Sequence, residues 1–201
     1  MNNEKYNTAG WLAIISGLLF PLAMILDIMS GATAELLGYS DFPVGIGLAD
    51  FIYIVYALFS IYVYSKFKNL LYEYYSYKKL NTIINLIIWL FIIFFGGSFL
   101  IELIMFPIFS PTDIGPPLFL LLFWGIGIFI FGVLDVLFAV FLLKESKIFS
   151  TEIKVFAIVI LIMGLFELSV IFSFMNIFII PIAFISWAFV FFKKNHEIDF
   201  V

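Results

Sequence analysis

The chain of 201 residues contains no cysteine, no arginine and only one histidine. Without cysteine there can be no disulfide, thiolate catalysis, iron–sulfur cluster or palmitoylation. Without arginine there is no guanidinium ladder of the kind a voltage sensor needs. Because His196 stands alone in a polar tail, bis-histidine haem ligation, a histidine-rich metal site and a Ser–His–Asp triad are excluded as well. The sequence therefore predicts no cofactor, no metal site and no catalytic residue.

Charge is also scarce, while apolar residues are abundant. Charged residues make up 12% of the chain and hydrophobic residues 65%, against about 25% and 45–50% in soluble proteins. A soluble fold of this length could not cover so much apolar surface, so lipid must be the solvent. The few lysines form short groups beside apolar segments, which argues against a nucleic-acid partner. We expect a single domain, residues 1–201, whose principal partner is the lipid bilayer.

Long apolar runs predict the architecture, because a helix needs about 20 mostly apolar residues to cross the hydrocarbon core. Six segments qualify and predict an all-α, polytopic membrane helix bundle with six transmembrane helices. These predicted spans are 10–29, 44–65, 80–106, 117–143, 153–174 and 177–192. Two alternatives stay open at this point. A single bent helix could replace the last two spans, and the first span, ahead of Ala32, could be a cleavable signal peptide.

Lysines occur in every second predicted connection and in the two tails. The two tails and the even-numbered connections contain all ten lysines, and the odd-numbered connections contain none. Positive residues stay on the cytoplasmic side because their translocation is disfavoured. A wrong number of spans would disrupt this alternation, so the lysines predict six spans with both termini in the cytoplasm.

Five carboxylates lie inside predicted spans: Asp27, Asp50, Glu102, Asp135 and Glu167. Each costs roughly 2.5–3.5 kcal/mol to insert into hydrocarbon, and no lysine lies within a span to pair with it. Each acid must therefore be protonated, face water, hold a cation or accept hydrogen bonds from neighbouring helices. We take Glu102, Asp135 and Glu167 as candidate ion- or proton-binding residues, with Asp27 and Asp50 as secondary candidates.

The depth of the five acids in the membrane follows from the rise of about 1.5 Å per helical residue. It predicts that Asp27, Asp50, Glu102 and Glu167 border one outward-facing cavity and that Asp135 lies deeper. A structural interpretation competes with this one. Asp27 and Asp50 could simply reach the outer headgroups, and the other three acids could act as protonated hydrogen-bonding groups between helices.

A family resemblance rests on short pieces of sequence. Residues 106–111 read FPIFSP, residues 37–40 read LGYS, and Pro181 precedes Trp187 by six positions. In these pieces the chain resembles a prokaryotic family of uncharacterised six-span membrane proteins, domain-of-unknown-function family 998. That family often has a glutamate after the Phe-Pro pair, where Ile108 stands here. The resemblance implies a six-span fold and a multi-pass location in a prokaryotic plasma membrane, and it implies no activity.

Three functional interpretations follow from the unpaired acids. The leading one is a small transporter-like protein that handles protons or cations at Glu102, Asp135 and Glu167, with a small molecule or cation as substrate. The alternative is an accessory or scaffolding subunit of a larger membrane complex, such as a substrate-binding importer subunit, that assembles with a second copy or another subunit. A lipid-directed enzyme with a metal held by paired carboxylates is the third. Because no catalytic motif occurs, we expect the chain not to be an enzyme.

Overall fold

The computed structural model describes residues 4–36, 47–105 and 115–193, with the side chains of 5–29, 47–104 and 118–193. All regular structure in these ranges is helical. The elements are α1 (Glu4–Leu36), α2 (Leu48–Tyr75), α3 (Asn81–Phe91), the π-helical segment η1 (Ile92–Gly96), α4 (Gly97–Met105), α5 (Gly115–Lys144), α6 (Thr151–Leu168), the 3₁₀ segment η2 (Ile171–Met175) and α7 (Asn176–Phe192). The predictions that rest on residues 37–40, 106–111 and His196 lie outside the described residues.

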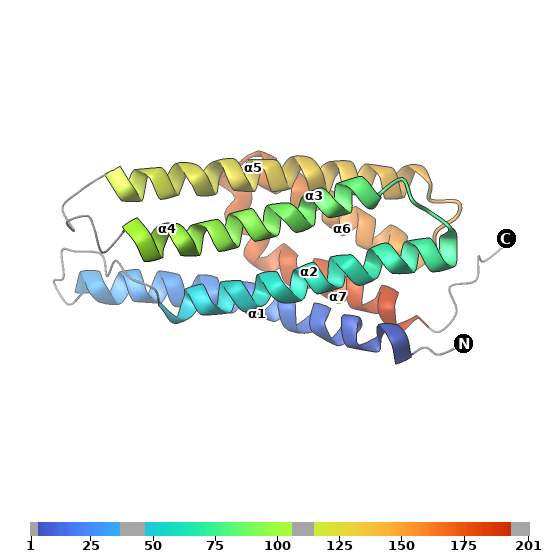
Figure 1. Cartoon of the computed structure of the whole chain (residues 1–201), viewed down its shortest axis with the longest axis horizontal. Coiled ribbons are helices and arrows are strands. Elements are labelled where there is room, and N and C mark those ends of the chain that lie inside the picture. The colour runs from blue at the N-terminus through green and yellow to red at the C-terminus, as the bar shows by residue number, and fades with distance from the viewer. Residues whose placement is uncertain (1–3, 37–46, 106–114, 194–201) are drawn as a thin grey trace.

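The helices form an elongated bundle along one common direction (Figure 1). Helix α1 packs against α2 and α7, α5 packs against α6, and α3 lies between α2 and α5. The segments α3, η1 and α4 follow one another without a break and form one rod. In the described part of the chain, five helices are long and apolar enough to cross a membrane. The prediction of an all-α, membrane-compatible fold is thus confirmed.

Several helix ends differ from the predicted spans. The first helix covers Glu4–Leu36 rather than 10–29, and the second covers Leu48–Tyr75 rather than 44–65. Hydropathy locates the apolar part of a helix, and polar residues of good helical propensity can continue it beyond that part. Lys66 and Lys68 continue α2 in this way. The third and fourth rods, 81–105 and 115–144, agree with prediction to within two residues.

Helix α6, which corresponds to the fifth predicted span, ends at Leu168 and not at the predicted residue 174. The hydroxyl of Ser169 donates to the carbonyl of Phe166 at 2.7 Å and accepts from the backbone N–H of Phe172 at 3.0 Å. These local bonds compete with helix continuation, and Val170 follows with a positive φ of 52°. Helix α7 then runs back alongside α6, so the alternative of a single bent helix is wrong.

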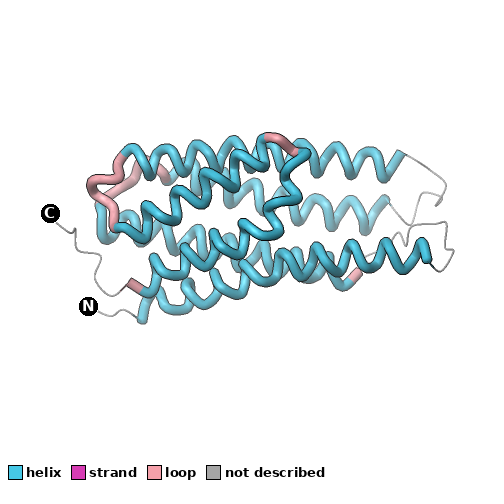
Figure 2. The backbone as a smooth tube through the Cα atoms, turned by 180° about the vertical axis from the view of Figure 1, so that it is seen from behind, coloured by secondary structure: helices cyan, strands magenta, loops and turns pink. Residues whose placement is uncertain are grey.

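The hairpin of α6 and α7 is shorter than the other rods. At about 1.5 Å per residue, its arms span roughly 27 and 25 Å, whereas the 30 residues of α5 span roughly 45 Å. Its turn therefore lies part-way along the bundle instead of at an end (Figure 2). Ile171, Phe172 and Phe174 at this turn are exposed and apolar, as suits a turn surrounded by lipid.

The start of α1, the end of α7 and the connections 76–80 and 145–150 all lie at one end of the bundle (Figure 1). Three ion pairs tie the segments together there: Lys5 with Glu73, Lys79 with Glu145 at 2.6 Å, and Lys193 with Glu152 at 2.9 Å. Ion pairs at the surface add little to stability because water and salt screen them. They place Lys5, Lys79 and Lys193 at the same end.

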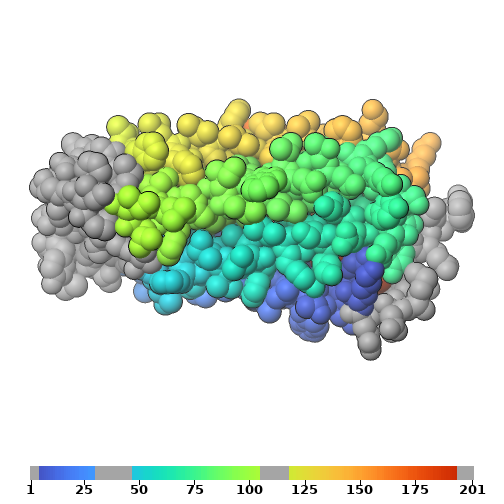
Figure 3. All heavy atoms as spheres, in the orientation of Figure 1, coloured from blue at the N-terminus to red at the C-terminus, as the bar shows by residue number. Residues whose placement is uncertain are grey.

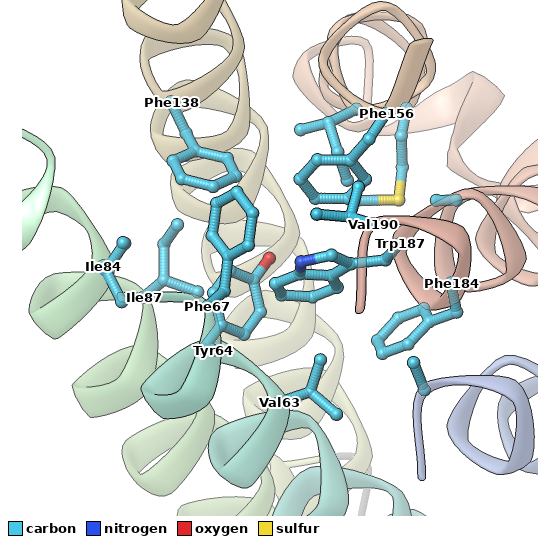
Figure 4. Close-up of a cluster of buried hydrophobic side chains, with 14 of the residues drawn as sticks. Val63, Tyr64, Phe67, Ile84, Ile87, Phe138, Phe156, Phe184, Trp187 and Val190 are labelled. Atoms are coloured by element: carbon cyan, nitrogen blue, oxygen red, sulfur yellow. The ribbon is translucent and has the colours of Figure 1, made fainter. Parts of the chain in front are cut away.

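An aromatic cluster fills the interior near this end (Figure 4). Trp187 of α7 is 1% exposed, and its ring lies 4.5 Å from Tyr64 of α2 and 4.8 Å from Phe156 of α6 between centroids. Phe67 and Phe138 extend the cluster toward α5. Edge-to-face and stacked aromatic pairs add to simple burial by about 0.5–1.5 kcal/mol each. The cluster joins four helices and closes the bundle at this level.

Candidate functional site

The two acids buried most deeply meet at the contact between α5 and α6. Asp135 of α5 is 2% exposed and Glu167 of α6 is 9% exposed. Their carboxyl groups lie within hydrogen-bonding reach of each other. Two carboxylates at such a distance repel each other strongly, so the pair is stable when it holds a proton or another cation. We refer to Asp135 and Glu167 as the deep pair.

Two glycines bring the deep pair together. Gly132 precedes Asp135 by three residues and Gly164 precedes Glu167 by three, so each glycine shares a helix face with its acid. A Cβ on Gly132 would lie 2.9 Å from the Cβ of Glu167, and one on Gly164 would lie 3.1 Å from the Cβ of Asp135. Each glycine thus packs against the acid of the opposite helix. This reciprocal contact sets the helix separation at which the two carboxyls meet.

Asn176, the first residue of α7, completes the polar group. Its side-chain amide donates to Glu167 Oε1 at 3.1 Å. Four further atoms here are buried and, apart from the mutual contact of the deep pair, have no hydrogen-bond partner among the described residues. They are Asp135 Oδ1, Glu167 Oε2, Asn176 Oδ1 and Trp187 Nε1. Buried polar atoms normally have partners. These four atoms therefore have the capacity to bind a ligand.

The deep pair borders a cavity of about 400 Å³ at the centre of the bundle, within the size range of small-molecule sites. Helices α1, α2, α3, α5, α6 and α7 and the segments η1 and η2 contribute to its lining. About half of the lining residues are aromatic, and they include Tyr53, Tyr56, Phe131 and Trp187. Among the described residues, the lining contains carboxyl groups and no basic side chain. The cavity therefore combines an apolar wall with negative or proton-holding groups.

The aromatic cluster closes one end of the cavity, and the short hairpin leaves the other end open. Tyr64 and Trp187 belong to both the cavity lining and the cluster. Ile28 of α1 and Phe174 at the hairpin turn line the cavity and are 62% and 50% exposed. The cavity thus reaches the apolar surface between α1 and the turn. On the opposite side, α2, α3, α4 and α5 present a continuous surface (Figure 3).

The other three acids, Asp27, Asp50 and Glu102, form a second group nearer the end of the bundle that lies away from the three ion pairs. The carboxyl groups of Asp50 and Glu102 lie within hydrogen-bonding reach of each other, and the hydroxyl of Tyr53 donates to Asp27. Asp50 also accepts a 2.6 Å hydrogen bond from the N–H of Gly47 at the start of α2, a favourable place for a carboxylate. Asp27 lines the cavity, whereas Asp50 and Glu102 do not.

The structure thus differs from the predicted single cavity bordered by four acids. Asp27, Asp135 and Glu167 line one cavity, and Glu102 lies apart with Asp50. Sequence reasoning missed Asn176 and the reciprocal role of Gly132 and Gly164. A signal was present, because a glycine stands three residues before an acid in two consecutive apolar segments. Among the described residues, no group of three or more Asp, Glu or His side chains is placed to hold a metal ion.

Comparison with known proteins adds no relative. No protein-family model, no curated protein and no solved structure matches this chain. The resemblance to domain-of-unknown-function family 998 stays a prediction.

Proposed function

We propose that this chain is a six-span protein of a prokaryotic plasma membrane, with both termini in the cytoplasm. The five long apolar helices support this. Helix α6 supplies the sixth span, although its 18 residues include three charged ones, Glu152, Lys154 and Glu167. The start of α1, the end of α7 and the lysine-containing connections 76–80 and 145–150 lie at one end (Figure 1), an arrangement that the positive-inside rule favours.

Because the chain has no cysteine, single introduced cysteines can test this topology. A membrane-impermeant maleimide on intact cells is expected to label Ser40→Cys and to leave Ser76→Cys and Lys147→Cys unlabelled. Permeabilised cells, in which all three become labelled, show that each site is reactive. Labelling of Ser76→Cys or Lys147→Cys in intact cells would contradict the proposed orientation.

Within this topology, we propose that the protein is a small transporter that couples substrate movement to a proton held by the deep pair. The observation that carries this proposal is the contact between Asp135 and Glu167 beside an accessible cavity. Neither acid has a basic partner among the described residues. Like charges so close cannot both ionise readily, so the pair retains a proton until a positive substrate replaces it.

The accessory-subunit alternative predicts a bundle without a polar cavity. The described helices instead surround a cavity of about 400 Å³ that holds carboxyl groups and unpartnered polar atoms. Burying such groups without hydrogen-bond or ionic partners costs free energy, which a bound ligand with complementary groups would offset. The geometry therefore favours transport over a purely structural role. The membrane-enzyme alternative also calls for paired carboxylates, which the deep pair supplies, but among the described residues no group of three or more Asp, Glu or His side chains is placed to hold a metal ion.

Proton flux in liposomes tests the transport proposal. Liposomes with an acidic interior and a trapped pH-sensitive dye receive external sodium, potassium, magnesium or organic amines one at a time. Wild-type protein is expected to discharge the gradient with at least one of these cations at ten or more times the protein-free rate. Glu167→Gln is expected to return the rate to the protein-free level, because a neutral amide cannot exchange a proton for a cation.

Glu102→Gln is the matched control, since it makes the same change at a membrane acid outside the cavity. It is expected to keep at least half of the wild-type rate. The transport proposal fails if no cation accelerates discharge or if Glu167→Gln is as active as wild type. Loss of flux in Glu102→Gln alone would move the proton-handling role away from the deep pair.

A further inference from the structure

We infer that the cavity binds a lipophilic organic cation, with aromatic rings around its apolar groups and its charge at the deep pair. This inference rests on the proposed function and specifies the substrate of the same site. It combines three independent features of the cavity: the chemistry of its wall, the position of its acids and its connection to the lipid-facing surface.

The wall selects for an apolar, positively charged ligand. Tyr53, Tyr56, Phe131 and Trp187 present rings to the cavity from α2, α5 and α7. Aromatic faces carry negative electrostatic potential and attract quaternary or similarly diffuse cations, most strongly where water is excluded. A small inorganic cation would need a shell of oxygen ligands, which this wall does not supply. A neutral apolar molecule would leave the deep pair without a partner.

The acids define where the charge would lie. Asp135 Oδ1 and Glu167 Oε2 are buried and lack other hydrogen-bond partners in the described protein. Both acids line the cavity. In a low-dielectric interior an opposite charge a few ångströms from the pair is strongly favoured. Entry of the cation can release the proton that the pair holds, so one positive charge replaces another and the net charge of the site does not change.

The opening suits a ligand that arrives from the bilayer. Ile28 and Phe174 are apolar, exposed and part of the lining. The hairpin of α6 and α7 ends part-way along the bundle and leaves this side uncovered by a further described helix (Figure 2). A lipophilic cation dissolved in the membrane can thus reach the cavity past apolar side chains, with Asp27 as the one carboxyl group beside Ile28 in the lining. At the other end, Tyr64 and Trp187 block passage in this conformation.

Two probe ions of nearly equal size and shape but opposite charge can test the inference. Tetraphenylphosphonium and tetraphenylborate would be equilibrated with purified protein in a neutral detergent, with protein-free micelles subtracted. Wild-type protein is expected to bind the phosphonium at least tenfold more tightly than the borate. Glu167→Gln and Asp135→Asn are each expected to weaken phosphonium binding at least tenfold, while Glu102→Gln stays within twofold of wild type.

Two charge-removing variants are used so that one still gives a result if the other loses its native fold. Among the described residues Asp135 has no hydrogen-bonding neighbour other than Glu167. Asp135→Asn therefore reports on charge even if Glu167→Gln loses its native fold, as judged by size-exclusion chromatography. Equal binding of the two probes, or unchanged phosphonium binding in a folded Asp135→Asn variant, would overturn the inference. Selective phosphonium binding without proton flux would keep the site and refute transport, whereas flux with equal probe binding would keep transport and refute the cation site.

Discussion

Gly132→Ala is expected to destabilise the protein and to separate the deep pair. The added Cβ would lie 2.7 Å from the backbone nitrogen of Leu168 and 2.9 Å from the carbonyl oxygen of Gly164. Backbone atoms cannot rotate away as a side chain can, so α5 and α6 must move apart. Overpacking of this kind costs about 1–3 kcal/mol, and the resulting displacement would lengthen the contact between Asp135 and Glu167.

Gly125→Ala provides the matched control on the same helix. A Cβ at Gly125 meets nothing within 4 Å, and alanine favours a helix over glycine by about 1 kcal/mol. This variant is expected to melt at or above the wild-type temperature, whereas Gly132→Ala is expected to melt several degrees lower and to bind tetraphenylphosphonium more weakly. Thermal melts monitored by circular dichroism in detergent measure the first difference. Equal melting temperatures of the two variants would show that the helix contact is looser than described.

The helical fold could be predicted because long apolar runs indicate where its helices lie. Apolar length identified the rods, and all of their approximate positions agree with the structure. The end of α6 could not be predicted in the same way. Residues 169–174 are as apolar as the helix before them, and the break depends on the hydrogen bonds of Ser169. Hydropathy contains no information about side chains that compete with the helix for backbone hydrogen bonds.

The candidate site could be predicted only in part. An acid in an apolar segment is conspicuous, so Asp135 and Glu167 could be identified from the sequence. Which acids meet depends on how each helix is rotated about its axis, and small errors in rotation change the partner. For this reason Glu102 was grouped with Glu167, although the structure places it beside Asp50. The glycine three residues before each deep acid could have indicated the correct pairing.

Proton release on cation binding is expected to be large in wild-type protein and absent when the deep pair is neutralised. If Asp135 and Glu167 share a proton, a bound cation between them favours ionisation of both groups. About one proton should then leave for each tetraphenylphosphonium bound near neutral pH. The double variant Asp135→Asn/Glu167→Gln has no carboxyl at this position. This double variant should release no proton. Its loss of tetraphenylphosphonium affinity should be no larger than that of either single variant, because the two acids act as one unit.

The other titratable groups of the cavity can be separated from the deep pair. Asp27, Tyr53, Tyr56 and Tyr64 also line it, but the three phenols ionise near pH 10 in their unperturbed state. Asp27→Asn therefore serves as the control for the remaining carboxyl, and it is expected to retain most of the release. Glu102→Gln, at an acid outside the cavity, is expected to retain all of it.

The most direct measurement of the central claim is the number of protons released per bound tetraphenylphosphonium in weakly buffered detergent solution, followed with a pH indicator. Our account predicts about one proton for wild-type protein and Glu102→Gln, and none for Asp135→Asn/Glu167→Gln. Cation binding without proton release in wild-type protein, or undiminished release in the double variant, would contradict it.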